Sequence, residues 1–358
     1  MRHASLWLLL ATLLCACASS SVPWPDNGPC DGALPMRGDG PMRGDGTIRR
    51  VTFPERDFVC AASSAERGCA ATAPLRSDAE RTVDVVNELG GATVAYVLDQ
   101  VALPSTRMNR FGQLEAVGYD LDGWGHGAGS GTTCATWSPD FVSAYEPGVA
   151  GVDNAFATFV SVLEGVFDPE TCPLGVTAGC LDGLLRRDVH EGALLLVLEL
   201  TGVDSLEHDP DVEAALYLVR VPEAPVQDVP ARPRDQDALG GEALVAPTRG
   251  DILHRRLRVR WPLLTLPRER FGYPTPLHDV ELRASVCANG LFRGHLGGAA
   301  TVDDLVAQGT EVFPPGSEDT IRSVIESFAD LDPGADPEVC TRVSTAYALE
   351  GVPAERTP

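Results

Sequence analysis

Carboxylates gather in a glycine-rich stretch of the chain, where their spacing could hold a metal ion. Asp120 and Asp122 lie one residue apart, so in an extended segment both side chains point to the same face. A glycine follows them, which lets the backbone curl and offer carbonyl oxygens. Calcium takes about six to eight oxygen ligands from carboxylates, amides and carbonyls. Provided that the fold brings the two segments together, we expect one calcium ion to be bound by Asp120, Asp122, Asp153 and Asn154.

A structural role is the alternative for the same residues, because aspartate and asparagine also cap turns and helix N-termini. The EF-hand pattern fails here, since counting from Asp120 its fifth position is Trp124 and its twelfth is Gly131. A second acidic segment, Asp330–Asp336 (DLDPGAD), is another candidate for a hard cation.

The common catalytic motifs are absent from the sequence. A serine-hydrolase elbow requires Gly-x-Ser-x-Gly, whereas Ala128 stands two residues before Ser130, and no His-Glu-x-x-His occurs. His126 lies near Asp122 in a glycine-rich loop, so the alternative function is a secreted or surface hydrolase that uses Asp120, Asp122 and His126. The favoured function is a non-catalytic binding or structural role.

The cysteines beyond the N-terminal region are even in number, which in an exported protein predicts up to four disulfides. We expect Cys172 and Cys180 to close a local loop, and Cys60 with Cys69 is a second candidate pair. No Cys-x-x-Cys occurs and no histidine lies close by, so zinc is a minor alternative. The disulfide candidates are Cys30, Cys60, Cys69, Cys134, Cys172, Cys180, Cys287 and Cys340.

The N-terminus has the pattern of an exported lipoprotein. Arg2 precedes a short apolar run, Leu6–Leu14, which is shorter than the roughly 20 residues that span a bilayer. Leu14-Cys15-Ala16-Cys17 resembles the bacterial lipobox, in which a cysteine after a small residue is lipidated and becomes the new N-terminus. Cys17 fits this pattern better than Cys15. An ordinary signal peptide with incidental cysteines is the alternative.

This interpretation divides the chain into three parts. Residues 1–16 form the signal peptide, 17–47 a flexible tether in which PMRGDG occurs twice, and 48–358 a mainly β globular domain with a long loop near 222–250. Ala18 follows Cys17, whereas in the lipoproteins that this pattern resembles an Asp at that position favours retention in the inner membrane. We therefore expect a lipid-anchored protein of the cell envelope, in the outer membrane.

The composition restricts the partners. The formal net charge is −23, which argues against nucleic acid and anionic membrane surfaces and is compatible with divalent cations. All 28 basic residues are arginines, which excludes lysine-dependent chemistry such as the P-loop and Schiff bases. We expect the membrane to be a partner through the lipid anchor, and the sequence does not identify a ligand or protein partner.

Hydrophobic patterns predict mainly strands. The apolar segments Thr93–Leu103, Glu191–Gly202 and Glu213–Val221 are typical of β-strands, the last two as a hairpin. Asn289-Gly290 predicts a second hairpin turn. Helical spacing predicts helices over Asp153–Phe167 and Ser317–Leu331. The predicted fold class is therefore mainly β, an antiparallel β-sandwich or jelly-roll-like fold with a few helices.

The segment Ile252–Trp261 (ILHRRLRVRW) alternates clearly and predicts one half-buried strand. Leu253, Leu257, Val259 and Trp261 would face the core, and the opposite face would carry His254, Arg256, Arg258 and Arg260. Such an arginine row could bind an anion. The preferred interpretation is a solvated face that pairs with acidic neighbours.

The acidic motifs also carry a family resemblance. GYDLDG, then GVDN and the late segment ADLDPGADPEVC, resemble a family of uncharacterised exported lipoproteins from myxobacteria and related bacteria. The resemblance covers roughly residues 90–350 and implies export and a shared acidic motif, without an activity. This chain departs from the family where Trp124-Gly125-His126 replaces further aspartates.

Overall fold

The computed structural model describes residues 48–52, 82–86, 89–103, 106–121, 140–145, 150–165, 169–172, 179–190, 195–219, 242–266, 275–312, 315–333 and 339–354. The predicted signal peptide, the tether and the lipidation site Cys17 lie outside these residues. So do Asp122, His126 and four cysteines that were predicted to form disulfides, Cys30, Cys60, Cys69 and Cys134.

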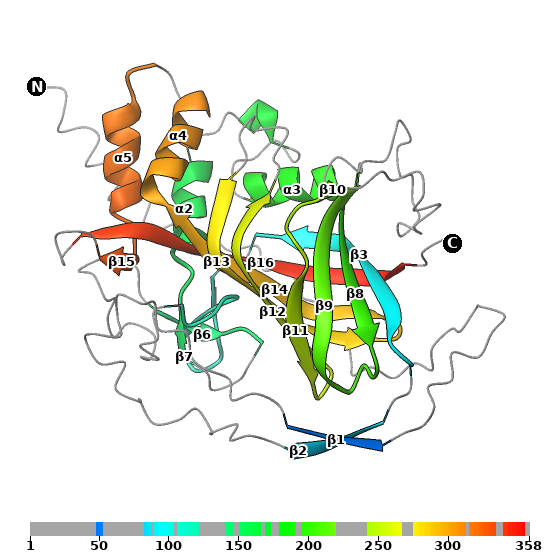
Figure 1. Cartoon of the computed structure of the whole chain (residues 1–358). Coiled ribbons are helices and arrows are strands. Elements are labelled where there is room, and N and C mark those ends of the chain that lie inside the picture. The colour runs from blue at the N-terminus through cyan, green and yellow to red at the C-terminus, as the bar shows by residue number, and fades with distance from the viewer. Residues whose placement is uncertain are drawn as a thin grey trace, which may run out of the picture.

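The described part of the chain is mainly β with four α-helices (Figure 1). The helices are α2 (Ala155–Glu164), α3 (Cys180–His190), α4 (Val302–Val312) and α5 (Glu318–Glu326), with a short 3-10 helix at Pro169–Thr171. The strands are β1 (Ile48–Thr52), β2 (Thr82–Val86), β3 (Ala92–Ala102), β4 (Arg107–Met108), β5 (Leu114–Ala116), β6 (Phe141–Ser143), β7 (Ala150–Val152), β8 (Leu195–Val203), β9 (His208–Val219), β10 (Glu242–Ala243), β11 (Thr248–Leu253), β12 (Arg256–Leu266), β13 (Thr275–Cys287), β14 (Gly290–Thr301), β15 (Leu331–Pro333) and β16 (Cys340–Ala354).

Eight strands form one closed antiparallel sheet. Their order is β3-β8-β9-β11-β12-β13-β14-β16, and β16 pairs with β3 to complete the ring. Spatial order thus follows chain order, an up-and-down arrangement in which every strand lies beside its sequence neighbours. The short strands β10 and β15 add to β9 and β16.

The expected sandwich or jelly roll is corrected by this closure. The antiparallel, mainly β character is confirmed, but the long strands form a single closed barrel and not two stacked sheets. In a closed sheet the backbone N–H and C=O groups of the first and last strands pair with each other, whereas an open sheet leaves them unpaired at its two edges. The alternation within each strand is the same in both architectures, so it does not distinguish them.

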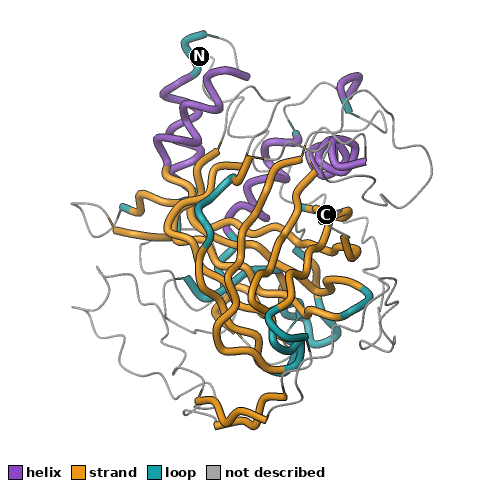
Figure 2. Tube along the Cα trace, turned by 45° about the vertical axis from the view of Figure 1, so that its right-hand side comes forward, coloured by secondary structure: helices purple, strands orange, loops and turns teal. Residues whose placement is uncertain are grey.

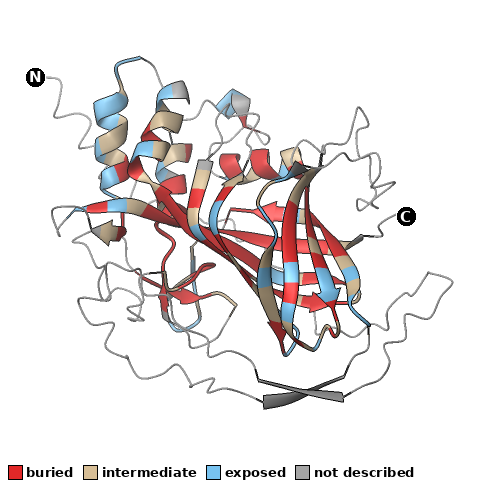
Figure 3. Cartoon of the chain, viewed as in Figure 1, coloured by how far each residue is buried: buried red, intermediate tan, exposed pale blue. Residues whose placement is uncertain are grey.

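The core lies on one face of the closed sheet. Alternate residues of all eight strands contribute to a single continuous apolar cluster, among them Leu198, Leu216, Leu257 and Trp261, and the strands are largely buried in Figure 3. Figure 2 shows the helices gathered at one end of the strands. Phe156 of α2 and Leu305 of α4 join the same cluster, so the helices extend the core at that end. No helix within the described ranges is long and apolar enough to cross a membrane.

A small second sheet has four strands in the order β4-β5-β6-β7. It is joined to the outside of the closed sheet through Tyr119, which follows β5 and whose hydroxyl donates to the His295 carbonyl oxygen. Within the small sheet β5 and β6 are parallel and the other pairs are antiparallel. Tyr119 and Asp153 form an isolated antiparallel bridge at its edge. This bridge joins the segment after β5 to the segment before α2.

Several predicted elements are confirmed. Strands β3, β8 and β9 match the predicted segments, and so do helices α2 and α5. The second hairpin is present, but its two-residue loop is Ala288-Asn289, one position earlier than predicted. Helices α3 and α4 were not predicted. Strand β10 and the start of β11 lie within the range expected as a loop, 222–250.

The prediction of a single strand over Ile252–Trp261 is wrong. The chain turns at His254 and Arg255, which have φ values of 52° and 61°, and β11 pairs with β12 across this turn. Such turns favour Asn and Gly because other residues are strained at positive φ. Neither occurs here, so the usual sequence signal for the turn is missing. The outward row of Arg256, Arg258 and Arg260 is nevertheless confirmed, since Leu257, Val259 and Trp261 are buried.

The predicted disulfide between Cys172 and Cys180 is confirmed, with the two Cα atoms 5.1 Å apart. It joins the 3-10 helix to the start of α3. Cys287 and Cys340 are disulfide-bonded as well.

Candidate functional site

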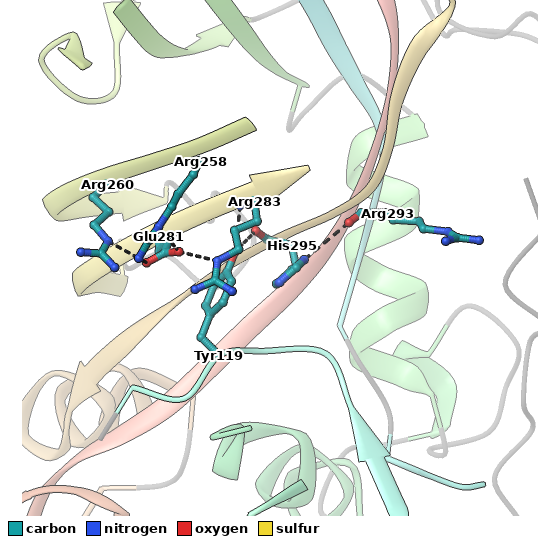
Figure 4. A network of polar contacts seen from close by, with 7 residues as sticks. All are labelled: Tyr119, Arg258, Arg260, Glu281, Arg283, Arg293 and His295. Carbon is teal, nitrogen blue, oxygen red and sulfur yellow. Dashed lines mark hydrogen bonds and ion pairs between the residues drawn. The ribbon is translucent and has the colours of Figure 1, made fainter. Parts of the chain in front are cut away.

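Three arginines converge on one buried glutamate on the outer face of the closed sheet (Figure 4). Glu281 of β13 accepts hydrogen bonds from Arg258 Nε at 2.8 Å, from Arg260 Nε at 2.7 Å and from Arg283 Nε. Arg258 also donates through Nη2 at 3.3 Å. We call these four residues the arginine cluster. Charge-assisted hydrogen bonds of this kind are about twice as strong as neutral ones.

Strand register explains the convergence. Arg260 stands opposite Glu281, and Arg258 stands opposite Arg283, on the antiparallel pair β12 and β13. Because side chains alternate along a strand, all four point to the same face. The next strand, β14, places Gly297 beside Glu281 and His295 beside Arg283.

The arginine cluster carries three positive charges and one negative charge. Asp251 of β11 stands opposite Arg258, so a second carboxylate borders the cluster. The Arg258 and Glu281 side chains are only 12% and 9% exposed, whereas Arg260 is 38% exposed. Arg260 bonds Glu281 through Nε (Figure 4), and neither of its two terminal nitrogens makes a hydrogen bond to the carboxylate. A planar guanidinium with two available donors is suited to carboxylate, phosphate or sulfate.

Tyr119 closes one side of the cluster. Its hydroxyl donates to the His295 carbonyl oxygen at 2.5 Å and accepts from the Arg283 backbone N–H at 2.9 Å. Its ring lies over Gly297, where a Cβ atom would approach Tyr119 Cδ2 to 2.7 Å. The Arg283 guanidinium lies 4.6 Å from the ring centroid, a cation–π contact. Tyr119 therefore holds the small sheet against the closed sheet and orients Arg283.

His295 is buried beneath these groups and is held neutral. Its ring stacks on Tyr119 with centroids 4.4 Å apart, and Nδ1 lies 3.5 Å from the Arg293 carbonyl oxygen. Burial, reinforced by the charge of Arg283, lowers the pKa of His295 to about 3. Both causes disfavour the imidazolium. His295 thus adds no charge to the cluster at neutral pH.

The structure brings together two of the segments predicted to bind calcium. Asp153 Oδ2 accepts the backbone N–H of Leu121 at 2.6 Å, directly after Asp120. Asn154 is the N-cap of α2, accepting from Ala157 N at 3.1 Å and donating to the Val117 carbonyl oxygen at 2.6 Å. These are the turn and cap roles of the alternative interpretation.

The calcium site itself stays a prediction. Asp122, one of its four expected ligands, lies outside the described residues together with His126 of the alternative hydrolase site. Among the described residues, no group of three or more His, Cys, Asp or Glu side chains is arranged to hold a metal ion.

The second acidic segment has structural contacts. Asp330 is buried and accepts hydrogen bonds from the backbone N–H of Ser344 at 2.8 Å and from its hydroxyl. The Ser344 hydroxyl in turn accepts from Ala155 N, at the start of α2, at 2.7 Å. Asp332 pairs with Arg342 at 3.2 Å. These contacts tie α2 and β15 to β16.

Part of the arginine cluster could be predicted from the sequence. Alternation along β12 identified the outward arginines, and the preferred interpretation, pairing with acidic neighbours, is confirmed for Arg258 and Arg260. Tyr119 and His295 were missed. Nothing in their local sequence indicates contact, because Tyr119 precedes Arg283 and His295 by more than 160 positions.

Comparison of the chain with protein-family models, with curated proteins and with solved structures finds no match.

The lowered pKa of His295 predicts acid sensitivity. The unfolded chain has a histidine pKa of about 6.5, so between about pH 6.5 and 3 it takes up a proton that the folded protein does not. Stability from this group is complete above pH 6.5 and falls as the pH drops. At pH 4.5 the loss should be about 2 to 3 kcal/mol. Urea unfolding at pH 7 and 4.5 should therefore show a smaller acid loss for His295→Gln than for the wild type. Equal losses would contradict the prediction.

Calcium binding predicts a shift in thermal stability. A ligand that binds only the folded state at a hundredfold excess over its Kd adds about 2.7 kcal/mol, which should raise the Tm by at least about two degrees for a domain of this size. We expect this rise on moving from EDTA to millimolar calcium, with magnesium as the control, and its loss in Asp122→Ala. Equal Tm values in EDTA and calcium would contradict calcium binding, and the aspartates would then serve only as turn and cap residues.

Proposed function

We propose that the protein is a lipid-anchored cell-envelope protein whose role is non-catalytic, and that it binds a small oxyanion at the arginine cluster. The observation that carries the proposal is the position of Arg260. Its Nε holds Glu281 at 2.7 Å while its terminal nitrogens remain available on a side chain that is 38% exposed. Glu281 thus positions the guanidinium and leaves a donor pair for a ligand.

Rigidity supports this proposal. Glu281 and Arg258 are almost completely buried, and Arg283 is fixed through its stacking on Tyr119. An anion that binds Arg260 meets donors whose conformational entropy has already been lost, so more of the contact energy appears as affinity. The chain has a net charge of −23, which repels anions. The excess positive charge of the arginine cluster attracts an anion locally in spite of this repulsion.

The lipid anchor is supported by the N-terminal sequence, where Ala16 and Leu14 precede Cys17 in the lipobox pattern. Eight cysteines beyond it agree with an exported protein, and the Cys172–Cys180 disulfide agrees with an oxidising compartment. The resemblance to exported lipoproteins has the same implication. Calcium at Asp120, Asp122, Asp153 and Asn154 would stabilise such a protein beside its ligand site.

Anion binding predicts a specific loss in Arg260→Gln. Isothermal titration with phosphate, sulfate and citrate should show binding of at least one anion to the wild type. Removal of one charge-assisted contact should weaken that affinity roughly 10- to 100-fold. The matched control is Arg249→Gln, since Arg249 is 82% exposed and pairs with Asp211 elsewhere on the sheet. Its affinity should stay within about twofold of the wild type.

A second variant separates anion binding from loss of structure. Glu281→Gln removes the internal anion and should destabilise the protein by about 3 to 5 kcal/mol, because Arg258, which is only 12% exposed, loses its partner. An added oxyanion should restore part of the lost Tm in this variant. Absence of binding to the wild type by all three anions, with no such restoration, would refute the proposed ligand class.

The anchor predicts that the mature N-terminus is lipidated Cys17. Mass spectrometry of the N-terminal peptide should find the acylated residue, and Cys17→Ala should move the protein out of the membrane fraction. Cys15→Ala is the matched control and should stay in that fraction. An unmodified N-terminus downstream of Cys17 would exclude the anchor while leaving the anion site open.

A further inference from the structure

The hairpin of β4 and β5 displays two large apolar side chains to solvent. Met108 is 63% exposed and Phe111 is 72% exposed, the two highest values among the exposed large hydrophobic residues of the described chain. Met108 is the last residue of β4, opposite Leu114, and Phe111 lies in the loop of residues 109–113 that joins the two strands. Exposed aromatic and thioether side chains grouped at one tip mark an interaction site more often than scattered ones do.

Hydrogen bonds hold this tip in one conformation. Asn109 Oδ1 accepts the backbone N–H groups of Phe111 and Gln113, each at 2.9 Å. Asn109 N donates to the Gln113 carbonyl oxygen at 2.8 Å, and Gly112 N donates to the Asn109 carbonyl oxygen at 3.0 Å. Gly112 has φ = 75°, which few other residues adopt. The chain thus fixes an arrangement in which the two apolar side chains point outward.

The charge at the tip is opposite in sign to that of the whole chain. Residues 106–114 (TRMNRFGQL) include two arginines and no acidic residue, in a protein of net charge −23. Arg107 pairs with Glu115 at 2.7 Å at the base of the hairpin. The Arg110 guanidinium lies 4.7 Å from the Phe111 ring centroid. The tip therefore presents a guanidinium directly beside an exposed aromatic ring.

We propose that this tip inserts into the headgroup region of a phospholipid bilayer. Phe111 and Met108 would reach the boundary of the acyl chains, and Arg110 would bind a lipid phosphate. Shallow insertion of a few apolar side chains beside basic residues is sufficient for interfacial binding. Two side chains on a tight turn are a small area for a stable protein interface, which needs about 1,200 Å² or more. The combination of exposed apolar groups with a phosphate-binding guanidinium fits the lipid interface.

This contact is independent of the arginine cluster and of the proposed lipid anchor. Arg110 is on the small sheet, whereas Arg258, Arg260 and Arg283 are on the closed sheet. If the anchor is present, the tether would keep the tip at high effective concentration near the bilayer. A weak insertion would then be enough to orient the protein on the membrane.

The test uses the full chain with Cys17→Ser, so that no anchor contributes, in vesicle sedimentation. Vesicles of pure phosphatidylcholine are compared with vesicles that contain phosphatidylglycerol. We expect the protein to partition onto phosphatidylcholine. Met108→Ser combined with Phe111→Ser should lower the partition coefficient about tenfold or more, and Arg110→Gln should lower it less. Val339→Ser is the matched control, since Val339 is 47% exposed elsewhere, and should have no effect.

A second measurement reports insertion directly. The indole introduced by Phe111→Trp should shift its emission to shorter wavelength and be quenched by brominated acyl chains when vesicles are added. The proposal would be overturned if the Cys17→Ser chain sedimented with neither kind of vesicle. It would also be overturned if the Met108→Ser, Phe111→Ser double variant had the same partition coefficient as the Cys17→Ser chain. An indole that responds to no vesicle would do the same. None of these results depends on anion binding by Arg260.

Discussion

The pairing of β3 with β16 is the constraint on which the rest of the structure depends. It joins the first and last strands of the ring, with Ala95 opposite Ala354 and Ala102 opposite Ala348. Without it the sheet would have two open edges, and the single apolar cluster formed by alternate residues of all eight strands would be exposed between them. The closed ring also fixes the curvature of β12 to β14 and thereby the outer face that carries the arginine cluster.

Charge on that outer face is tolerated because each group is held by several neighbours. Glu281 is almost fully buried, a position that would be unfavourable for an unpaired carboxylate. Three guanidinium groups compensate it, and Tyr119, from the segment after β5, covers the cluster on one side. The absence of a side chain at Gly297 makes room for the Tyr119 ring. The Tyr119 contact that joins the two sheets is therefore also part of the arginine cluster, so the contact and the charge network depend on each other.

Features that depend on neighbouring residues could be predicted from the sequence, whereas features that depend on distant partners could not. Runs of apolar residues located β3, β8 and β9, and short spacing located the Cys172–Cys180 disulfide. Ring closure was missed because no local pattern records which strand β16 will pair with. The turn at His254 and Arg255 was missed because tertiary contacts enforce positive φ without Asn or Gly. The contacts of Tyr119 could not be predicted for the same reason, since its partners lie far along the chain.

Closure of the ring also determines when the closed sheet can form during synthesis of the chain. The chain is made from its N-terminus, and β3 (Ala92–Ala102) emerges long before β16 (Cys340–Ala354). Until that last strand arrives, β3 has no partner on one edge and the inner apolar face cannot be sealed. Folding of the ring must therefore wait for the release of β16, and pairing of such distant segments is slow.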